Sequence, residues 1–515
     1  LALHFLESGE KDKALDYFLK AGERAQKIYA NNEAASYLQS ALRLLEEKEG
    51  DSQEKVHVLE RLGDVKKLVG EYDACLKYWD EALLLLTKLQ ENMRASILHR
   101  KIANILWDKM GDAEKAKEHH EACLNILETE SESVENARLY HDMAYMQWRN
   151  GDYVKAFASA EKALTLAERL NALEVVADAC LDLCMLLRFS GDFKKCREYA
   201  SRALKTALDN DYLEIAVLAY DRVGGFLPSE EYEKRLECFE KGLSLAKKVG
   251  DISRQSWFLG DLADTYLSMG ELDKAITLGE EALALDKKVG SIAYTWSILG
   301  LLGIAYQILG EWGKSEQYYD EVAAISRKLT DLFPKADSHF VHGWLHFDKE
   351  EYAKARESFE KAYKMVERTG NRWVPVNYSQ YLIWAFVELG EIERAQSLLE
   401  ALQKFALETE DKSLNASEMA LRAMLFRAQK KYGESIELFE KTLREWESIK
   451  ANIWDAYLFA RWVLCEYARV YLERNEEGDR EKAFNLLNQA LELFQKLDAK
   501  KDIERIIAKK KLLTA

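Results

Sequence analysis

The sequence contains very little proline, and this scarcity is the first guide to its fold. Only three prolines, Pro228, Pro334 and Pro375, occur in 515 residues. Proline interrupts helices because it lacks a backbone N–H group and its ring clashes with the preceding turn. With 48% apolar and 31% charged residues, a chain so poor in helix breakers is typical of a helical protein with many amphipathic segments.

Cysteine pairs, long apolar runs and an excess of positive charge are also missing. The seven cysteines are scattered and none forms a C-x-x-C pair, which argues against a disulfide framework and predicts free thiols in a reducing cytoplasm. No apolar run approaches the roughly eighteen residues of a membrane span. Lys and Arg number 73 against 89 Asp and Glu, and a net charge of −16 argues against a general nucleic-acid or membrane surface.

Signatures of catalysis are absent as well. No G-x-S-x-G, H-E-x-x-H or Gly-rich nucleotide motif occurs. Residues 310–315, GEWGKS, resemble the end of a phosphate-binding loop. Such a loop needs a glycine five residues before Gly313, and Ile308 stands there instead. We therefore predict a chain that is not an enzyme and that holds no cofactor.

A short motif, G-[DE]-x-x-K followed by a small residue, recurs along nearly the whole chain. Its copies, some of them degenerate, begin at positions 9, 70, 111, 151, 191, 230, 270, 310, 350, 390, 430 and 478. Between positions 70 and 430 the copies are 39 to 41 residues apart, which indicates a repeat array. The longer first step predicts an extra helix or helix pair near residues 29–34, and the last step carries eight extra residues.

Each repeat is predicted to form two antiparallel helices, because apolar residues recur at helical spacing on both sides of the motif. The motif glycine ends the first helix in a left-handed conformation, and the acidic residue after it caps the second. Two sites hold small residues, which predicts close packing of the helices. The site at the end of the motif holds Ala14, Cys75, Ala116, Ala156, Cys196, Ala275, Ser315, Ala355, Ala395, Ser435 and Ala483, and only Arg235 departs from the rule. The site seven residues before the motif, or six before the degenerate copy at 230, holds Gly63, Ala144, Cys184, Gly224, Ala263, Gly303, Gly343 and Ala423.

An aromatic residue two positions into the motif completes the pattern, at Tyr72, Tyr153, Phe193, Tyr232, Trp312, Tyr352 and Tyr432. The whole pattern resembles the tetratricopeptide repeat in a forty-residue variant. The resemblance implies an all-α fold, an α-solenoid wound into a right-handed superhelix of about twelve to thirteen hairpins that binds proteins. We expect one array over 1–515, with a divergent junction at 1–60, regular repeats over 61–444, and a longer final repeat with a C-terminal cap over 445–515.

Both ends of the chain carry a second resemblance. Residues 1–45 begin LALHFLESGEKDKALDYFLKAGERAQKIYANNEAA, and residues 493–506 read LFQKLDAKKDIERI. These segments resemble the ends of the repeat region in large signalling ATPases of the STAND type, such as the maltose-regulon activator. The resemblance implies a sensor arm that binds a small-molecule inducer or a partner and follows an ATPase module. The lack of an initiator Met fits a fragment of such a protein, and a free-standing scaffold for protein partners is the alternative.

The family register predicts which side chains of the first helices face the concave side. The candidate groove residues are Arg100, Asn104, Trp107, Arg138, His141, Tyr145, Trp148, Arg149, Arg188, Tyr220, Trp257, Trp344 and Trp384. Further inward positions are Asp178, Asp264, Gln307, Phe347, Asn377, Gln380 and Arg427. Large aromatic residues on a surface tend to mark binding sites. The arginines and aromatic residues between positions 100 and 188 suit an anionic or planar ligand, or a peptide, unless successive turns of the superhelix cover them.

Histidine and cysteine pairs supply the remaining candidates. His339, His342 and His346 share one helical face, a spacing that could hold zinc, but these positions coincide with packing sites of the repeat. Cys180 and Cys184 stand one helical turn apart at packing positions, and we expect both in the core. Packing is the favoured interpretation for both groups.

Overall fold

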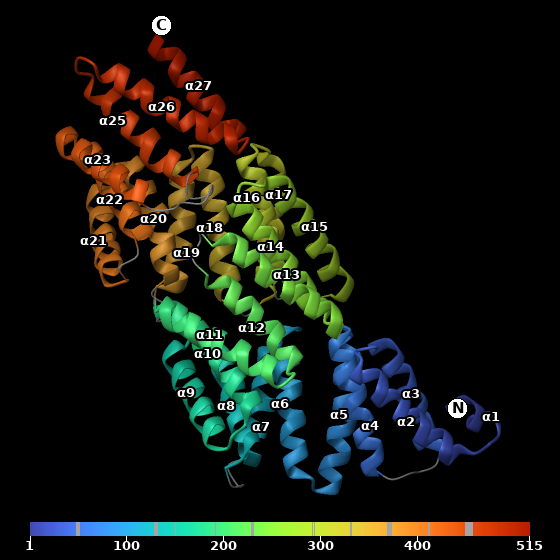
Figure 1. Ribbon diagram of the computed structural model, residues 1–515. Helices are drawn as coiled ribbons and strands as arrows, with labels where there is room; N and C mark the ends of the chain where they lie inside the picture. The colour runs from blue at the N-terminus through green and yellow to red at the C-terminus, as the bar shows by residue number, and fades with distance from the viewer. Residues whose placement is uncertain are drawn as a thin grey trace.

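The computed structural model describes residues 1–47, 52–127, 132–149, 151–190, 192–227, 231–290, 292, 294–329, 332–367, 373–409, 412–448 and 457–514. These residues form helices and contain no strand. The chain is an α-solenoid, in which antiparallel helical hairpins follow one another along a superhelix (Figure 1). The helical fold and the repeat architecture expected from the motif are confirmed.

The first helices of the hairpins are α1 (Ala2–Glu7), α4 (Ser52–Leu68), α6 (Asn92–Asp108), α8 (Val134–Arg149), α10 (Leu173–Ser190), α12 (Leu213–Gly225), α14 (Ile252–Ser268), α16 (Thr295–Ile308), α18 (Leu332–Asp348), α20 (Trp373–Leu389) and α22 (Lys412–Ala428). The second helices are α2 (Lys11–Lys27), α5 (Tyr72–Leu89), α7 (Ala113–Leu127), α9 (Tyr153–Arg169), α11 (Phe193–Asp209), α13 (Tyr232–Val249), α15 (Leu272–Val289), α17 (Trp312–Ser326), α19 (Tyr352–Val366), α21 (Ile392–Thr409) and α23 (Tyr432–Ser448). The last hairpin pairs the π-helix η1 (Ala460–Cys465) and α25 (Glu466–Arg474) with α26 (Asp479–Lys496). The helix α3 (Asn31–Glu47) is the predicted extra helix, and α27 (Lys500–Thr514) follows the last hairpin.

Every hairpin turn that lies within the described residues has the predicted left-handed residue. The motif glycines have positive φ, for example +79° at Gly70 and +78° at Gly310. Where the motif lacks glycine, Glu350 and Lys430 adopt the same conformation, with φ of 61° and 58°. Glycine reaches this region without the steric cost that a side chain brings. These two positions therefore carry strain that the other turns avoid.

Whether the acidic residue after the turn caps the second helix depends on the length of its side chain. Asp152 and Asp192 accept hydrogen bonds from the backbone N–H groups three residues on, as expected of helix caps. Glu311 makes no such bond and instead forms an ion pair with Lys314 at 2.9 Å. The lysine of the GEWGKS segment thus pairs with the acid of its own turn, and Ser315 is fully buried at the small site.

The two small sites explain how closely the helices of a hairpin pack. All the small residues predicted at the end of the motif are completely buried, from Ala14 to Ala483. At the other site, a Cβ atom on Gly63 would lie 2.1 Å from the indole nitrogen of Trp79. Gly303 faces Tyr319 in the same way, at 2.3 Å. A large aromatic ring of the second helix therefore rests on a glycine of the first, and the predicted close packing is confirmed.

Successive turns of the superhelix touch one another. The Asn31 side chain at the start of α3 donates a hydrogen bond of 3.0 Å to the carbonyl oxygen of Val249, which ends α13, and this contact is buried. Gly70 lies against Val289 at the end of α15. Figure 1 shows the N-terminal helices meeting the ends of α13 and α15. None of the helices in the described ranges combines the length and the apolar character needed to cross a bilayer.

Candidate binding cavity on the inner face

A cavity of about 640 Å³ opens on the inner face of the N-terminal half. Its walls come from the first helices α4, α6, α8, α10 and α12, together with Tyr29 and Trp79. Ligand sites in proteins usually have volumes of about 300–1,000 Å³. Four of the candidate groove residues line it, namely Arg100, Asn104, Arg138 and His141, and so does Asp178. The cavity thus brings together the polar part of the predicted set.

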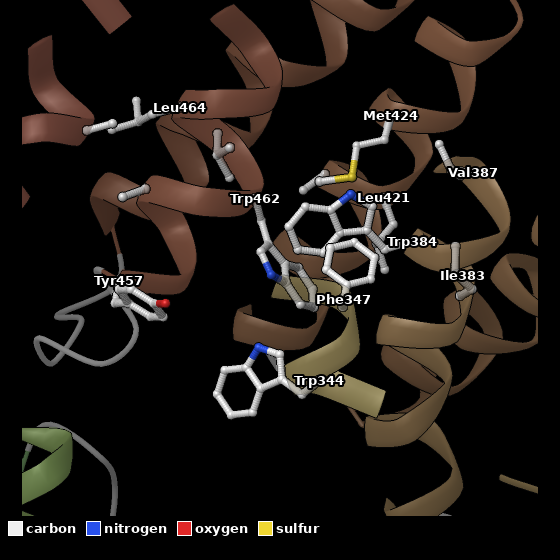
Figure 2. Close-up of a cluster of buried hydrophobic side chains, with 14 of the residues drawn as sticks. Trp344, Phe347, Ile383, Trp384, Val387, Leu421, Met424, Tyr457, Trp462 and Leu464 are labelled. Atoms are coloured by element: carbon white, nitrogen blue, oxygen red, sulfur yellow. The ribbon is translucent and has the colours of Figure 1, made fainter. Parts of the chain in front are cut away.

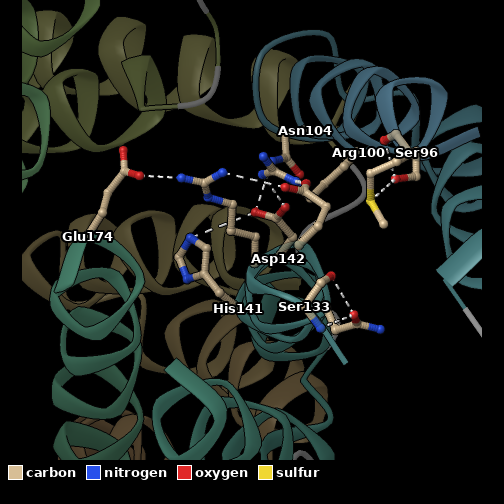
Figure 3. A network of polar contacts seen from close by, with 11 residues as sticks. Ser96, Arg100, Asn104, Ser133, His141, Asp142 and Glu174 are labelled. Atoms are coloured by element: carbon tan, nitrogen blue, oxygen red, sulfur yellow. Dashed lines mark hydrogen bonds and ion pairs between the residues drawn. The ribbon is translucent and has the colours of Figure 1, made fainter. Parts of the chain in front are cut away.

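The two arginines of the cavity are already paired with carboxylates (Figure 3). Arg100 donates to Glu135 at 2.6 Å and to Asp142 at 2.8 Å, and Asn104 donates to the other oxygen of Asp142 at 2.9 Å. Arg138 pairs with Glu135 and Glu174. Although burial opposes it, the charges of Arg100 and His141 lower the pKa of Asp142. These ion pairs occupy the guanidinium groups that an anionic ligand would need.

His141 completes this network as a cation. Its Nδ1 atom lies 2.5 Å from a carboxylate oxygen of Asp182 on α10. Burial alone would lower the pKa of His141, but the carboxylates of Asp182, Asp178 and Asp142 outweigh it and raise the pKa to about 10. The imidazole is therefore protonated at neutral pH.

Three carboxylates of the cavity form no ion pair of their own, although the charge of the nearby His141 acts on Asp178. Within the part of the chain that the structure describes, Asp178, Asp211 and Glu214 form neither an ion pair nor a side-chain hydrogen bond. Burial raises the pKa of Asp178 to about 6. Asp211 and Glu214 stand at the start of α12, close enough to Tyr29 that, together with burial, they raise its pKa. The cavity therefore contains carboxylates that could accept hydrogen bonds from a ligand, whereas its arginines are already occupied.

Aromatic candidates gather at a second place on the inner face. Trp257 packs against Tyr294 with ring centroids 3.7 Å apart, and Arg254 lies over the Trp257 ring at 4.8 Å. The Tyr145 hydroxyl lies 3.2 Å from that of Tyr294, 149 residues further on, and Trp148 lies against Tyr145. Tyr145, Trp148 and Trp257 thus help to join two turns of the superhelix.

The tryptophans predicted in the C-terminal part of the groove present little surface to a ligand, which corrects the expectation. Trp344 and Trp384 are 4% and 6% exposed, in a core completed by Trp462 of η1 (Figure 2). The Trp384 and Trp462 rings meet edge-on at 5.6 Å. The reason is that the longer last repeat lays its first helix over these residues, so successive parts of the superhelix cover them.

The remaining candidates are dispersed. Trp107 is 7% exposed and belongs to the N-terminal core, so it too is a packing residue. Arg188 is exposed and lies over the Phe226 ring at 5.9 Å, while Tyr220 is half-buried. The side chain of Arg149 lies outside the described residues. Of the further inward positions, Gln307 and Arg427 are buried in polar networks and Phe347 is in the core.

The histidine and cysteine groups occupy packing sites. His342 contacts the Ser338 carbonyl oxygen and Asp320, and His346 contacts Glu351 at 2.7 Å. In the described ranges, no three His, Cys, Asp or Glu side chains lie together in a way that could hold a metal ion. Cys180 and Cys184 are fully buried, as predicted.

Sequence reasoning missed the acidic residues that dominate this face. Asp142, Asp182, Asp221 and Asp261 are inner-helix residues at the same position of four consecutive repeats, nine residues before each motif. Asp221 pairs with Arg222, and burial together with the Asp221 charge raises the pKa of Asp261 well above its usual value. The signal for this series was present in the repeat alignment, as an aspartate recurring every 39 to 40 residues.

Comparisons with known proteins agree with the repeat reading. The tetratricopeptide repeat family matches residues 93–169, 259–293 and 292–368. No curated protein matches the chain significantly.

Similar solved structures include a Rap protein complexed with competence and sporulation factor, at 12% identity and a TM-score of 0.39, covering 74% of this chain and 99% of that one. BtubC from P. vanneervenii has 17% identity and a TM-score of 0.35, over 42% of this chain and 92% of its own. The Cut9–Hcn1 hetero-tetramer of the APC/C has 14% identity and a TM-score of 0.33, with 96% of both chains covered. Likeness at this level says nothing about function. The family matches are decisive for the segments that they cover: the chain contains tetratricopeptide repeats.

Proposed function

We propose that the chain binds a protein or peptide partner in the cavity between α4 and α12. The observation that carries this proposal is a cavity of about 640 Å³ whose walls are the inner helices of successive repeats. Arrays of such repeats curve so that their first helices present an extended concave surface. Tetratricopeptide repeats are typically non-catalytic interaction scaffolds, and both family models that match the chain are of this repeat.

A selection of displayed peptides on the purified chain tests this proposal, with two matched Leu→Trp variants. Leu218 lines the cavity and is half-buried, so Leu218→Trp narrows the site. Leu208 is 44% exposed on α11 and lines no part of it, so Leu208→Trp is the control. Selected peptides are expected to bind Leu208→Trp as tightly as the wild type and Leu218→Trp at least tenfold more weakly. Equal binding to both variants would place the partner elsewhere and refute the proposal.

The wider role that we propose is that of a sensor arm in a larger STAND-type ATPase. The resemblance at residues 1–45 and 493–506 supports it, and an inducer or partner protein would be its ligand. Intact mass analysis of the native protein from its source cells tests this role. A polypeptide much heavier than the 59.3 kDa of these residues, with a phosphate-binding loop before Leu1, is expected. A native mass of 59.3 kDa would favour the free-standing scaffold.

A further inference from the structure

The charge balance of the cavity indicates the chemistry of its occupant, and this inference rests on the binding function proposed above. The lining residues and their direct ion-pair partners include eight carboxylates: Asp64, Glu135, Asp142, Glu174, Asp178, Asp182, Asp211 and Glu214. Against them stand four basic side chains, Lys67, Arg100, Lys101 and Arg138, and the protonated His141. The site is therefore about three charges negative.

The position of the surplus charge is as informative as its size. Most of the paired charges line the α6 and α8 side, where Arg100 and Arg138 pair with Glu135 and Asp142, and Arg138 also reaches Glu174 at the start of α10. The carboxylates that form no ion pair, Asp178, Asp211 and Glu214, lie on the α10 and α12 side. Asp178 is half-buried, so its charge is screened less than in open water, whereas Asp211 and Glu214 are exposed and can be reached directly by a ligand cation.

Two tyrosines stand beside these carboxylates. Tyr29, in the turn before α3, and Tyr212, at the start of α12, are half-buried and line the same cavity. An aromatic face attracts an ammonium or guanidinium group within about 6 Å of the ring centre. A wall of carboxylates with neighbouring aromatic rings suits the side chains of lysine and arginine.

The acidic series continues past the cavity along the inner face. Asp221 on α12 and Asp261 on α14 follow Asp142 and Asp182 at the same repeat position. In the described part of the chain, the buried Oδ2 atom of Asp261 has no hydrogen-bond partner. Asp142, Asp182 and Asp221 are already paired with Arg100, His141 and Arg222, so these three make the inner face acidic without adding free acceptors.

We propose that the cavity receives a basic segment of a partner protein, whose lysine or arginine side chains contact Asp178, Asp211 and Glu214. The size of the cavity, about 640 Å³, favours a peptide over a free polyamine. The expected contacts are charge-assisted hydrogen bonds to the three carboxylates, with the aliphatic stems of the side chains against Tyr29 and Tyr212.

Fluorescently labelled hexalysine, titrated into the intact chain at 0.1 M salt, is the first probe. The triple variant Asp178→Asn, Asp211→Asn, Glu214→Gln removes the unpaired charges, and it should lower the affinity for hexalysine at least tenfold. The control triple Glu161→Gln, Glu198→Gln, Asp209→Asn removes three exposed charges on α9 and α11, outside the cavity, and should change it less than twofold. Both triples change the net charge from −16 equally, so a difference reports on the site.

Several results would overturn the inference. Equal loss in both triples would mean that hexalysine senses only the overall charge of the protein. Spermidine should bind at least tenfold more weakly than hexalysine, and equal binding would exclude a peptide as the intended occupant. If the first triple unfolds, which its melting curve shows, the double variant Asp211→Asn, Glu214→Gln replaces it, because both residues are exposed. Unchanged hexalysine binding by that double variant would also refute the inference.

The peptide selection separates this inference from the proposed function. Peptides that depend on Leu218 and are rich in lysine and arginine support both. Peptides that depend on Leu218 but lack basic residues leave the proposed function standing and refute the basic occupant. If no selected peptide is sensitive to Leu218→Trp, the proposed function itself fails.

Discussion

The contact between Gly63 and Trp79 allows a sharp test of how the hairpins pack. An alanine at position 63 would place its Cβ atom 2.1 and 2.2 Å from two atoms of the Trp79 indole, far inside van der Waals contact. Trp79 cannot easily move aside. It is 1% exposed, its indole N–H donates to the Glu60 carbonyl oxygen at 3.2 Å, and Lys101 lies over its ring.

Two opposing effects set the size of the change in Gly63→Ala. Alanine in a helix interior is favoured over glycine by about 1 kcal/mol. Overpacking a tight core costs about 1–3 kcal/mol, and the severity of this overlap points to the upper part of that range. We expect a net destabilisation of about 1–2 kcal/mol. Gly313→Ala is the matched control, because no atom lies within 4 Å of the added Cβ, and a gain of up to about 1 kcal/mol is expected there.

The assay must resolve single hairpins, because long repeat arrays do not unfold in one cooperative step. Hydrogen exchange read out by mass spectrometry meets this need. Gly63→Ala should increase exchange in α4 and α5, and exchange in α20 and α21 should stay unchanged. Wild-type protection of α4 and α5 in Gly63→Ala would show that the ring can shift, and it would refute the packing argument.

Four further predictions concern a turn, two covered contacts and the half-buried His141. Lys430→Gly should raise the stability of its hairpin by about 0.5–1 kcal/mol, measured by hydrogen exchange, because it relieves a left-handed lysine. Trp462→Ala should cost about 3–5 kcal/mol in the C-terminal half and shift the tryptophan emission of the protein to longer wavelength as Trp384 meets water; an unchanged spectrum would contradict the packing seen here. Asn31→Ala should leave the Val249 carbonyl oxygen unpaired, cost about 1–3 kcal/mol, and speed exchange at the start of α3 and at the end of α13; exchange confined to α3 would mean that the contact does not join the turns. The pKa of His141 is raised to about 10 from an ordinary value of about 6.5, so its stabilising effect is complete below about pH 6.5 and is lost as the pH rises through 10. The protection of α8 and α10 against hydrogen exchange, corrected for the intrinsic rate at each pH, should therefore fall between pH 8 and 10.5 in the wild type and less so in His141→Gln.

The repeat pattern predicted most of the fold because it depends on contacts within one hairpin. The left-handed turn at Gly70, the buried Ala156 and the ring resting on Gly303 all involve residues fewer than twenty positions apart. Such contacts recur with the repeat and can be seen in the sequence.

The register also showed which residues face inward, but it could not show what meets them there. The partner of Trp384 is Trp462, in a later repeat of altered length, and the partners of Arg100 come from the following hairpin. These contacts depend on the pitch of the superhelix and on the irregular last repeat. For this reason the sequence could predict that Trp384 and Arg100 face inward. It could not predict that Trp384 is buried or that the charge of Arg100 is neutralised.

The two halves of the inner face differ in what can cover them, and this difference restricts where a partner can bind. In the C-terminal half the face is aromatic, through Trp344, Phe347 and Trp384, and exposing it to water would be costly. The chain covers it with its own η1 segment, so little of that surface is left to a ligand. In the N-terminal half the face is built of ion pairs and surplus carboxylates, which water can solvate in the free protein. Such a surface can stay open until a partner arrives, and we expect partners to be selected there by charge more than by apolar contact.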